Sequence, residues 1–135
     1  REVCDPEGLE GGGTAAGLNL LPLRTVFGGA KVLRQRRCRA LWPAALEAAA
    51  APVEVEGFEL HRGLSTLLPT AADAPCQPLC ADPDLGWVWP QGDHHGLVAG
   101  TYLHGVFESG PWRRRWLTQL RRRKALPPLA EVQPH

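Results

Sequence analysis

The chain has 135 residues, a net charge of +1 at pH 7, 44% hydrophobic residues and 21% charged residues. These values are typical of a folded globular domain and exclude a chain that is disordered throughout. No window approaches about 18 consecutive apolar residues, so the sequence predicts no membrane-spanning helix. The first residues lack the apolar core of a signal peptide, which predicts a cytoplasmic protein. Because Met is absent even at position 1, we interpret the sequence as part of a longer protein whose beginning is missing.

Basic residues gather in two clusters, five between positions 31 and 39 and seven between positions 113 and 124, without an acidic residue in either. Such clusters occur where proteins contact nucleic acids or anionic membranes, but also on solvated surfaces. No aromatic residues alternate with the basic ones as in a nucleic-acid-binding surface, and no helix-turn-helix pattern accompanies them. We therefore predict solvated faces, with neither nucleic acid nor membrane as a partner.

The first third of the chain predicts loops and one strand. Residues 8–17 form a glycine-rich loop, which lacks the Lys-Ser/Thr of a phosphate-binding loop. Residues 18–27 are predicted to be an apolar turn that runs into a strand. Residues 42–51 have helical propensity, although they also fit an alanine-rich loop.

A strand is predicted over residues 53–56, where apolar and charged side chains alternate as on a half-buried strand. Gly57 interrupts the alternation, and residues 58–61 resume it in a shifted register. A glycine at such a place predicts either a bulge or a close approach of another backbone. Both are common beside active sites.

The last third predicts a surface loop, two strands and a helix. Residues 69–84 are expected to form the loop, and residues 87–89 a strand. The run 97–104 is apolar until its last residue, which suits a strand buried on both faces of an α/β sheet. An amphipathic helix is expected from Pro111 onward, since proline is favoured in the first turn and Trp112, Trp116, Leu117 and Leu120 share one face.

The four cysteines, Cys4, Cys38, Cys76 and Cys80, are predicted to be free thiols. Cys76 and Cys80 with His94 and His95 have the residue types of a zinc site. Prolines flank the two cysteines, however, and the segment is typical of a variable loop. We therefore predict no metal site.

Two histidines are candidates for chemistry. His104 stands at the end of the apolar run 97–104, where chemistry gathers in open α/β sheets, and it fits a general base beside a nucleophile. His61 also ends a predicted strand and is followed closely by Gly63. Either ring could instead be a structural histidine held by backbone hydrogen bonds.

Three segments resemble the glutaminase domain of the cobyric acid synthase family. The first comprises Asp5-Pro6-Glu7-Gly8-Leu9-Glu10, Gly17-Leu18-Asn19-Leu20-Leu21-Pro22 and Thr25-Val26-Phe27. The second, Gly57-Phe58-Glu59-Leu60-His61-Arg62-Gly63, is similar to the family's Gly-Tyr-Glu-Ile-His-x-Gly. The third, Gly100-Thr101-Tyr102-Leu103-His104-Gly105-Val106-Phe107-Glu108, is similar to the segment that supplies the family's catalytic histidine. The resemblance covers about residues 5–126.

This resemblance implies a fold, a reaction and site residues. The fold would be part of a class I glutamine amidotransferase, α/β and flavodoxin-like, with a mostly parallel sheet and flanking helices. Residues 1–126 would be the C-terminal part of that domain and 127–135 a tail. His104 would be catalytic and His61 would bind substrate. The partners would be glutamine and a corrinoid. The corrinoid would bind to a synthetase domain that is absent from this sequence and uses ATP and Mg²⁺.

The implied reaction is the glutamine-dependent amidation of peripheral carboxylates of adenosylcobyrinic acid a,c-diamide, in cobalamin biosynthesis. The family's nucleophilic cysteine belongs to a glycine-rich elbow that has no counterpart in this sequence, and Cys4 does not replace it. The chain alone is therefore expected to be inactive. The alternatives are a sister amidotransferase, acting on the a,c-carboxylates or on a cell-wall lipid precursor, and a non-catalytic remnant.

Overall fold

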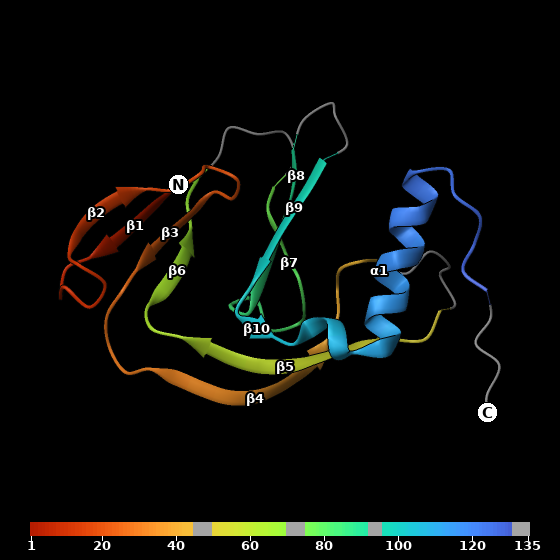
Figure 1. Cartoon of the computed structure of the whole chain (residues 1–135), viewed down its shortest axis with the longest axis horizontal. Coiled ribbons are helices and arrows are strands. Elements are labelled where there is room, and N and C mark those ends of the chain that lie inside the picture. The colour runs from red at the N-terminus through yellow and green to blue at the C-terminus, as the bar shows by residue number, and fades with distance from the viewer. Residues whose placement is uncertain (45–49, 70–74, 92–95, 131–135) are drawn as a thin grey trace.

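Strands dominate the computed structural model, which describes residues 1–44, 50–69, 75–91 and 96–130 (Figure 1). The chain order of the elements is β1 (Glu2–Asp5), β2 (Gly13–Ala16), β3 (Leu23–Val26), β4 (Val32–Arg39), β5 (Glu54–His61), β6 (Leu64–Leu67), β7 (Gln77–Pro78), β8 (Gly86–Gln91), β9 (Gly96–Thr101), β10 (Leu103–His104), the 3-10 helix η1 (Val106–Glu108) and α1 (Gly110–Arg123). None of the helices in these ranges has the length and apolar character needed to cross a membrane.

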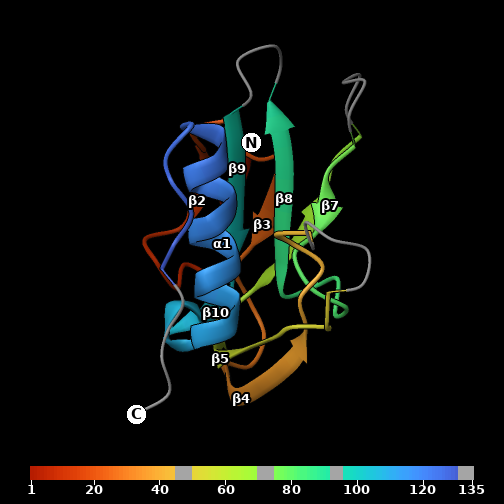
Figure 2. The same ribbon diagram turned by 90° about the vertical axis from the view of Figure 1, so that its right-hand side faces the viewer.

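The strands form three small sheets, with the orders β2-β1-β3-β6, β10-β5-β4 and β7-β8-β9. Among the described strands, β1 and β3 are the one parallel pair, and the other neighbours run antiparallel. The long β4-β5 hairpin lies below the other two sheets in Figure 1, and α1 stands to their right there and in front of β9 in Figure 2.

The predicted α/β, flavodoxin-like fold with a mostly parallel sheet is wrong for this chain. A parallel sheet needs a crossover, usually a helix, between neighbouring strands. The described residues contain a single α-helix, which follows the last strand and connects no strands. Antiparallel neighbours that follow one another in the chain, such as β1 and β2, need no such crossover.

The expected single strand over residues 97–104 is also wrong. The segment divides at Tyr102 into β9, which pairs with β8, and β10, which pairs with β5. Within β9, Ala99 is exposed, so this strand is not buried on both faces. An apolar run of this length does not distinguish one buried strand from two half-buried ones.

The β5 register is continuous through Gly57, so the predicted shift is wrong. Residues 32–39 of β4 pair one to one with residues 61–54 of β5, and Gly57 lies opposite Arg36. Val55, Gly57, Glu59 and His61 therefore share one face of the sheet. This is the face of Val55, which is fully buried.

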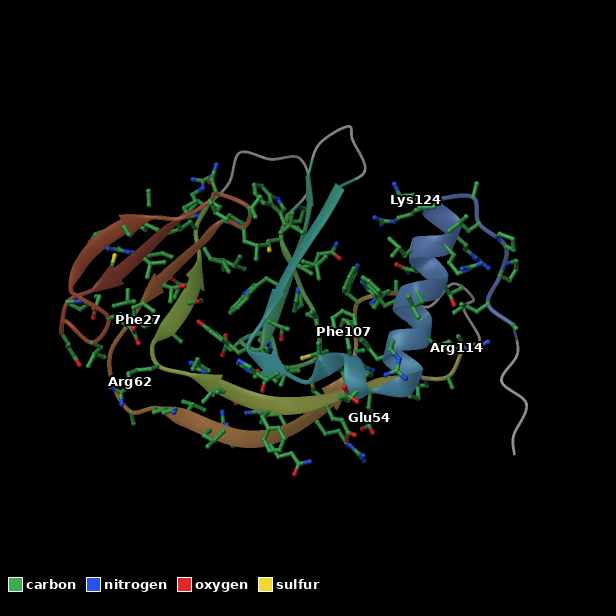
Figure 3. All side chains as sticks on the ribbon, viewed as in Figure 1. Phe27, Glu54, Arg62, Phe107, Arg114 and Lys124 are labelled. Carbon is green, nitrogen blue, oxygen red and sulfur yellow. The ribbon has the colours of Figure 1, made fainter. Side chains whose placement is uncertain are left out.

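The predicted helix is confirmed, with proline in its first turn. Trp112 is buried, and its indole N–H donates to the carbonyl oxygen of Trp42 at 2.9 Å. Phe107, labelled in Figure 3, meets the rings of Trp112 and Trp116 edge-on at 5.3 and 5.1 Å. The core beneath the helix comprises Ala40, Val55, Leu79, Cys80, Leu85, Val88, Leu103, Val106 and Trp112.

Asp5 organises the predicted glycine-rich loop. Its carboxylate accepts backbone N–H groups of Glu10 at 2.7 Å, Leu9 at 2.9 Å and Gly12 at 2.9 Å. These donors, that of Glu10 above all, hold the pKa of the Asp5 carboxyl below its usual value. The loop is shorter than the predicted 8–17, because residues 13–16 form β2, which pairs with β1.

We predict that Asp5→Asn destabilises the chain at pH 7, because one amide oxygen cannot accept all three donors. Because the pKa of Asp5 is lower in the folded state, its carboxylate stabilises the fold at pH values above the unfolded pKa of 3.8. This stabilisation is lost as the pH falls through the folded-state pKa. The wild-type advantage in urea unfolding should therefore vanish under strongly acidic conditions. A difference that persists unchanged there would contradict the role of the carboxylate charge.

We predict that Trp112→Ala lowers the free energy of unfolding by about 3–5 kcal/mol, because it leaves a cavity in the core and frees the Trp42 carbonyl. Leu120→Ala on the same helix is the control, since Leu120 is 41% exposed. Its effect should stay within about 0.5 kcal/mol. Equal losses in the two variants, measured by urea unfolding, would contradict this packing.

Candidate functional site

His104 is an exposed side chain at the end of β10. Its Nδ1 lies 3.1 Å from the carbonyl oxygen of Tyr102. A carbonyl oxygen only accepts, so Nδ1 carries a proton, and in the neutral ring Nε2 keeps a free lone pair. Gly105, at φ 77°, then turns the chain into η1. The ring thus has one nitrogen fixed and the other available to take a proton from a substrate or a nucleophile.

Gly57 lies directly against the backbone of His104. A Cβ at Gly57 would collide with the carbonyl oxygen of His104 and lie 3.4 Å from the Cβ of Leu103. The close approach predicted from the glycine is confirmed, without a bulge. A side chain at position 57 would displace the strand that carries the candidate base.

His61, at the end of β5, has both ring nitrogens occupied within the chain. Nδ1 lies 2.8 Å from the carbonyl oxygen of Gly63, and Nε2 lies 2.9 Å from Oε1 of Glu59. The ring also stacks on Tyr102, with centroids 4.0 Å apart and planes at 20°. Substrate binding by His61 stays a prediction, and neither nitrogen is free to bind glutamine in this arrangement.

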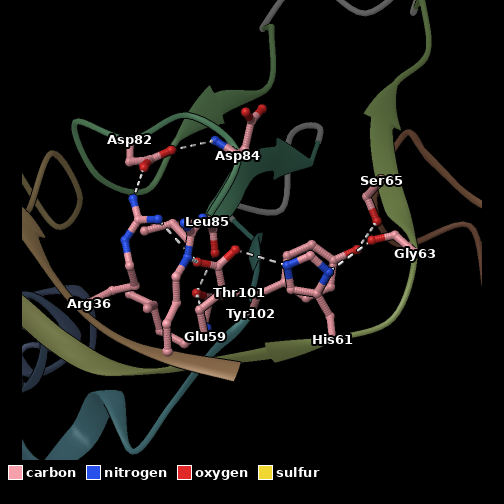
Figure 4. Close-up of polar contacts among 12 residues, drawn as sticks. Arg36, Glu59, His61, Gly63, Ser65, Asp82, Asp84, Leu85, Thr101 and Tyr102 are labelled. Carbon is pink, nitrogen blue, oxygen red and sulfur yellow. Dashed lines mark hydrogen bonds and ion pairs between the residues drawn. The ribbon is translucent and has the colours of Figure 1, made fainter. Parts of the chain in front are cut away.

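Glu59 is a buried carboxylate that the sequence analysis did not single out, and it lies at the centre of the polar cluster in Figure 4. Its Oε2 accepts Arg34 at 2.7 Å and Arg36 at 3.1 Å. Arg36 also pairs with Asp82. Arg34 first, then His61, holds the pKa of Glu59 below its usual value. Continuing the alternation from Val55 without a break would have revealed this inward face.

The two candidate histidines lie on opposite faces of β5. Leu103 pairs with Glu59 and His104 pairs with Phe58, and cross-strand partners share a face. His104 is therefore on the outer face with Phe58, which is 55% exposed. His61 is on the inner face, and Tyr102 connects the two.

The four cysteines are free thiols, as predicted. Burial, followed by a hydrogen bond with Cys80, raises the pKa of the Cys38 thiol to about 12. Burial also raises the pKa of Cys76. Cys4 lies in β1 and its sulfur accepts from Arg24 at 3.7 Å.

The alternative zinc site cannot be followed in full, because His94 and His95 lie outside the described residues. Within the described ranges, no three His, Cys, Asp or Glu side chains form a group that could hold a metal ion. The thiol of Cys80 instead donates to the carbonyl oxygen of Asp82 at 3.3 Å.

Comparison with known proteins assigns the segment that contains both histidines to a family. Residues 1–112 match the CobB/CobQ-like glutamine amidotransferase domain. The chain belongs to this family. Cobyric acid synthase of Synechococcus sp. strain CC9311 is 63% identical over 139 residues, which cover 99% of the chain and 26% of the relative.

Two further relatives agree with this assignment. Cobyric acid synthase of Synechococcus sp. strain RCC307 is 57% identical over 100% of the chain and 24% of the relative. That of Nostoc sp. strain PCC 7120 is 44% identical over 92% of the chain and 23% of the relative. The amidotransferase chain thus spans about a quarter of the length of the curated relatives it matches. No solved structure matches it.

We predict that Gly57→Ala displaces β10 of this amidotransferase chain and costs about 1–3 kcal/mol of stability, because the added methyl overlaps the His104 carbonyl. Amide resonances of His104 and Gly105 should shift. Gly110→Ala is the matched control, since a Cβ there meets nothing within 4 Å. Unchanged His104 resonances in Gly57→Ala would contradict the close approach.

Proposed function

We propose that this chain supplies the general base of the glutaminase site of a cobyric acid synthase. The observation that carries the proposal is the hydrogen bond of His104 Nδ1 to the Tyr102 carbonyl, which leaves Nε2 free on an exposed strand end. The names of the relatives above support the choice of cobyric acid synthase within the family. We assign residues 1–126 to the C-terminal part of the glutaminase domain and 127–135 to a tail.

In the proposed reaction, a cysteine from the part of the protein outside this chain attacks the side-chain carboxamide of glutamine. Nε2 of His104 takes the thiol proton and returns it to the leaving ammonia. Water then hydrolyses the thioester and releases glutamate. The Tyr102 carbonyl keeps Nδ1 as the donor throughout, so the free lone pair stays on the nitrogen that moves the proton.

The ammonia would amidate peripheral carboxylates of adenosylcobyrinic acid a,c-diamide in a synthetase domain that also lies outside this chain. ATP and Mg²⁺ would act there. The described residues do not fit a resident metal, since they bring no three metal-binding side chains together. No step assigned to this chain uses one.

We predict that His104→Ala removes glutamine-dependent activity, because the thiol loses its proton acceptor. The test uses a chimera in which this chain replaces the matching segment of the Synechococcus sp. strain CC9311 enzyme. Glutamate release and corrinoid amidation from glutamine should fall about 10²–10⁴-fold. Amidation supplied with ammonium salt should be unchanged. The bare 135-residue chain should release no glutamate.

His95→Ala is the control for loss of a histidine outside the three motifs, and it should retain full activity. A chimera indifferent to His104→Ala would contradict the proposal. So would steady glutamate release from the bare chain, because that would require a nucleophile among its own four thiols. Parallel loss of the ammonium-dependent reaction would point to misfolding instead of a missing base.

A further inference from the structure

The two ring nitrogens of His61 face groups that accept hydrogen bonds. Nδ1 lies 2.8 Å from the backbone carbonyl oxygen of Gly63, which cannot donate. Nε2 lies 2.9 Å from a carboxylate oxygen of Glu59. A neutral imidazole has one N–H and would leave one of these contacts without a proton. Both contacts are satisfied if the ring carries two.

The alternative, a protonated Glu59 that donates to His61, is opposed by the charges around that carboxylate. Arg34 and Arg36 both donate to its second oxygen, at 2.7 and 3.1 Å. They favour the ionised form, and the pKa of Glu59 is lowered accordingly. Asp82 neutralises part of the charge of Arg36, and none of the contacts between described residues joins Asp82 to Glu59. The proton shared by the pair therefore belongs to His61.

A charged His61 ring explains its contact with Tyr102. The two rings stack at 4.0 Å and 20°, which places the imidazole over the tyrosine face within the distance at which a cation is attracted to it. The Tyr102 hydroxyl hydrogen-bonds to Ser65, which in turn bonds Thr25 at 2.6 Å. Trp87 meets the Tyr102 ring edge-on at 5.7 Å. Tyr102 is thus held on its face, its edge and its hydroxyl.

The carbonyl of this same tyrosine accepts the Nδ1 proton of His104, 3.1 Å away. We propose that His61 is an imidazolium, fixed by Glu59 and Gly63, whose stacking on Tyr102 sets the orientation of the His104 ring. His61 is then a positioning residue and does not contact glutamine. This inference rests on the proposed function only where it concerns catalysis, since the charge of His61 is a property of the chain itself.

The two roles open to His61 predict different kinetics. A glutamine-binding ring would contribute mainly to KM. A ring that orients the base contributes to kcat, because misplacement of a catalytic group by about 1 Å is enough to cost as much as 10²-fold in rate. The matched control is Arg37→Gln, which removes an ion pair to Glu56 on the exposed face of the same two strands.

The protonation of His61 is measured first, on the ¹⁵N-labelled 135-residue chain at pH 7.5. Long-range ¹H–¹⁵N spectra of the rings distinguish an imidazolium from either neutral tautomer. We expect two protonated nitrogens at His61 and a proton on Nδ1 alone at His104. Glu59→Gln should convert His61 to a neutral ring, and Arg37→Gln should leave it charged. A neutral His61 in the wild-type chain would overturn the inference.

Kinetics are then measured on the chimera described above. His61→Gln and Tyr102→Leu should lower the glutamine-dependent kcat about 10- to 100-fold, with KM for glutamine within twofold. The ammonium-dependent rate should not change, and Arg37→Gln should match wild type. A rise in KM at constant kcat would overturn the positioning role in favour of direct binding.

The spectra separate this inference from the proposed function. If the unmutated chimera shows only ammonium-dependent activity, the proposed function fails, whereas the His61 and His104 ring states can still be read in the chain. In that case His61→Gln should still change the tautomer of His104, so that the proton is no longer on Nδ1 alone. An unchanged His104 tautomer in a folded His61→Gln chain would overturn the inference whatever the chimera does.

Discussion

The buried carboxylate of Glu59 is the interaction on which the arrangement of the sheets depends. An ionised carboxylate is costly to bury unless it is paired and hydrogen-bonded, and here two arginines of β4 and His61 surround it. Contacts continue from Arg36 to the segment before β8, and from His61 through Tyr102 to β6 and β3. No buried side-chain nitrogen or oxygen in the described ranges lacks a partner. One charged group therefore links all three sheets, and its loss would leave several polar groups unpaired at once.

Local patterns predicted some elements well. The helix after Pro111, the strand around residues 87–89 and the strands over 53–61 followed from periodicity and turn residues alone. The inward face of β5 did not. Phe58 is 55% exposed while Glu59 is buried, the reverse of the usual hydrophobic order. The apolar preference of Phe58 suggested a register shift at Gly57, and a shift would have turned Glu59 outward. Polar residues on a core face are a sign of a site, and the unbroken alternation from Val55 was the signal for it.

The division of the run 97–104 into two strands could not be predicted from the same patterns. The run 97–104 is apolar enough for a strand covered on both sides, but its division at Tyr102 depends on two separate partners, β8 and β5. Those pairings join residues far apart in sequence, so no local window contains them. The motif around His104 indicated the candidate base but not the residues that contact it. The group that orients its ring is the backbone carbonyl two residues earlier in the same motif, and only the structure shows this.

The four thiols of this chain have low reactivity toward electrophiles. Alkylating reagents attack thiolates, and burial keeps the Cys38 and Cys76 groups in the thiol form at neutral pH. Cys80 has no exposed surface and Cys4 is buried. A reactive thiol brought into contact with this chain would thus be labelled with little contribution from these four cysteines. The rate of that labelling would report the ionisation of the added thiol, with no need to replace Cys4, Cys38, Cys76 and Cys80.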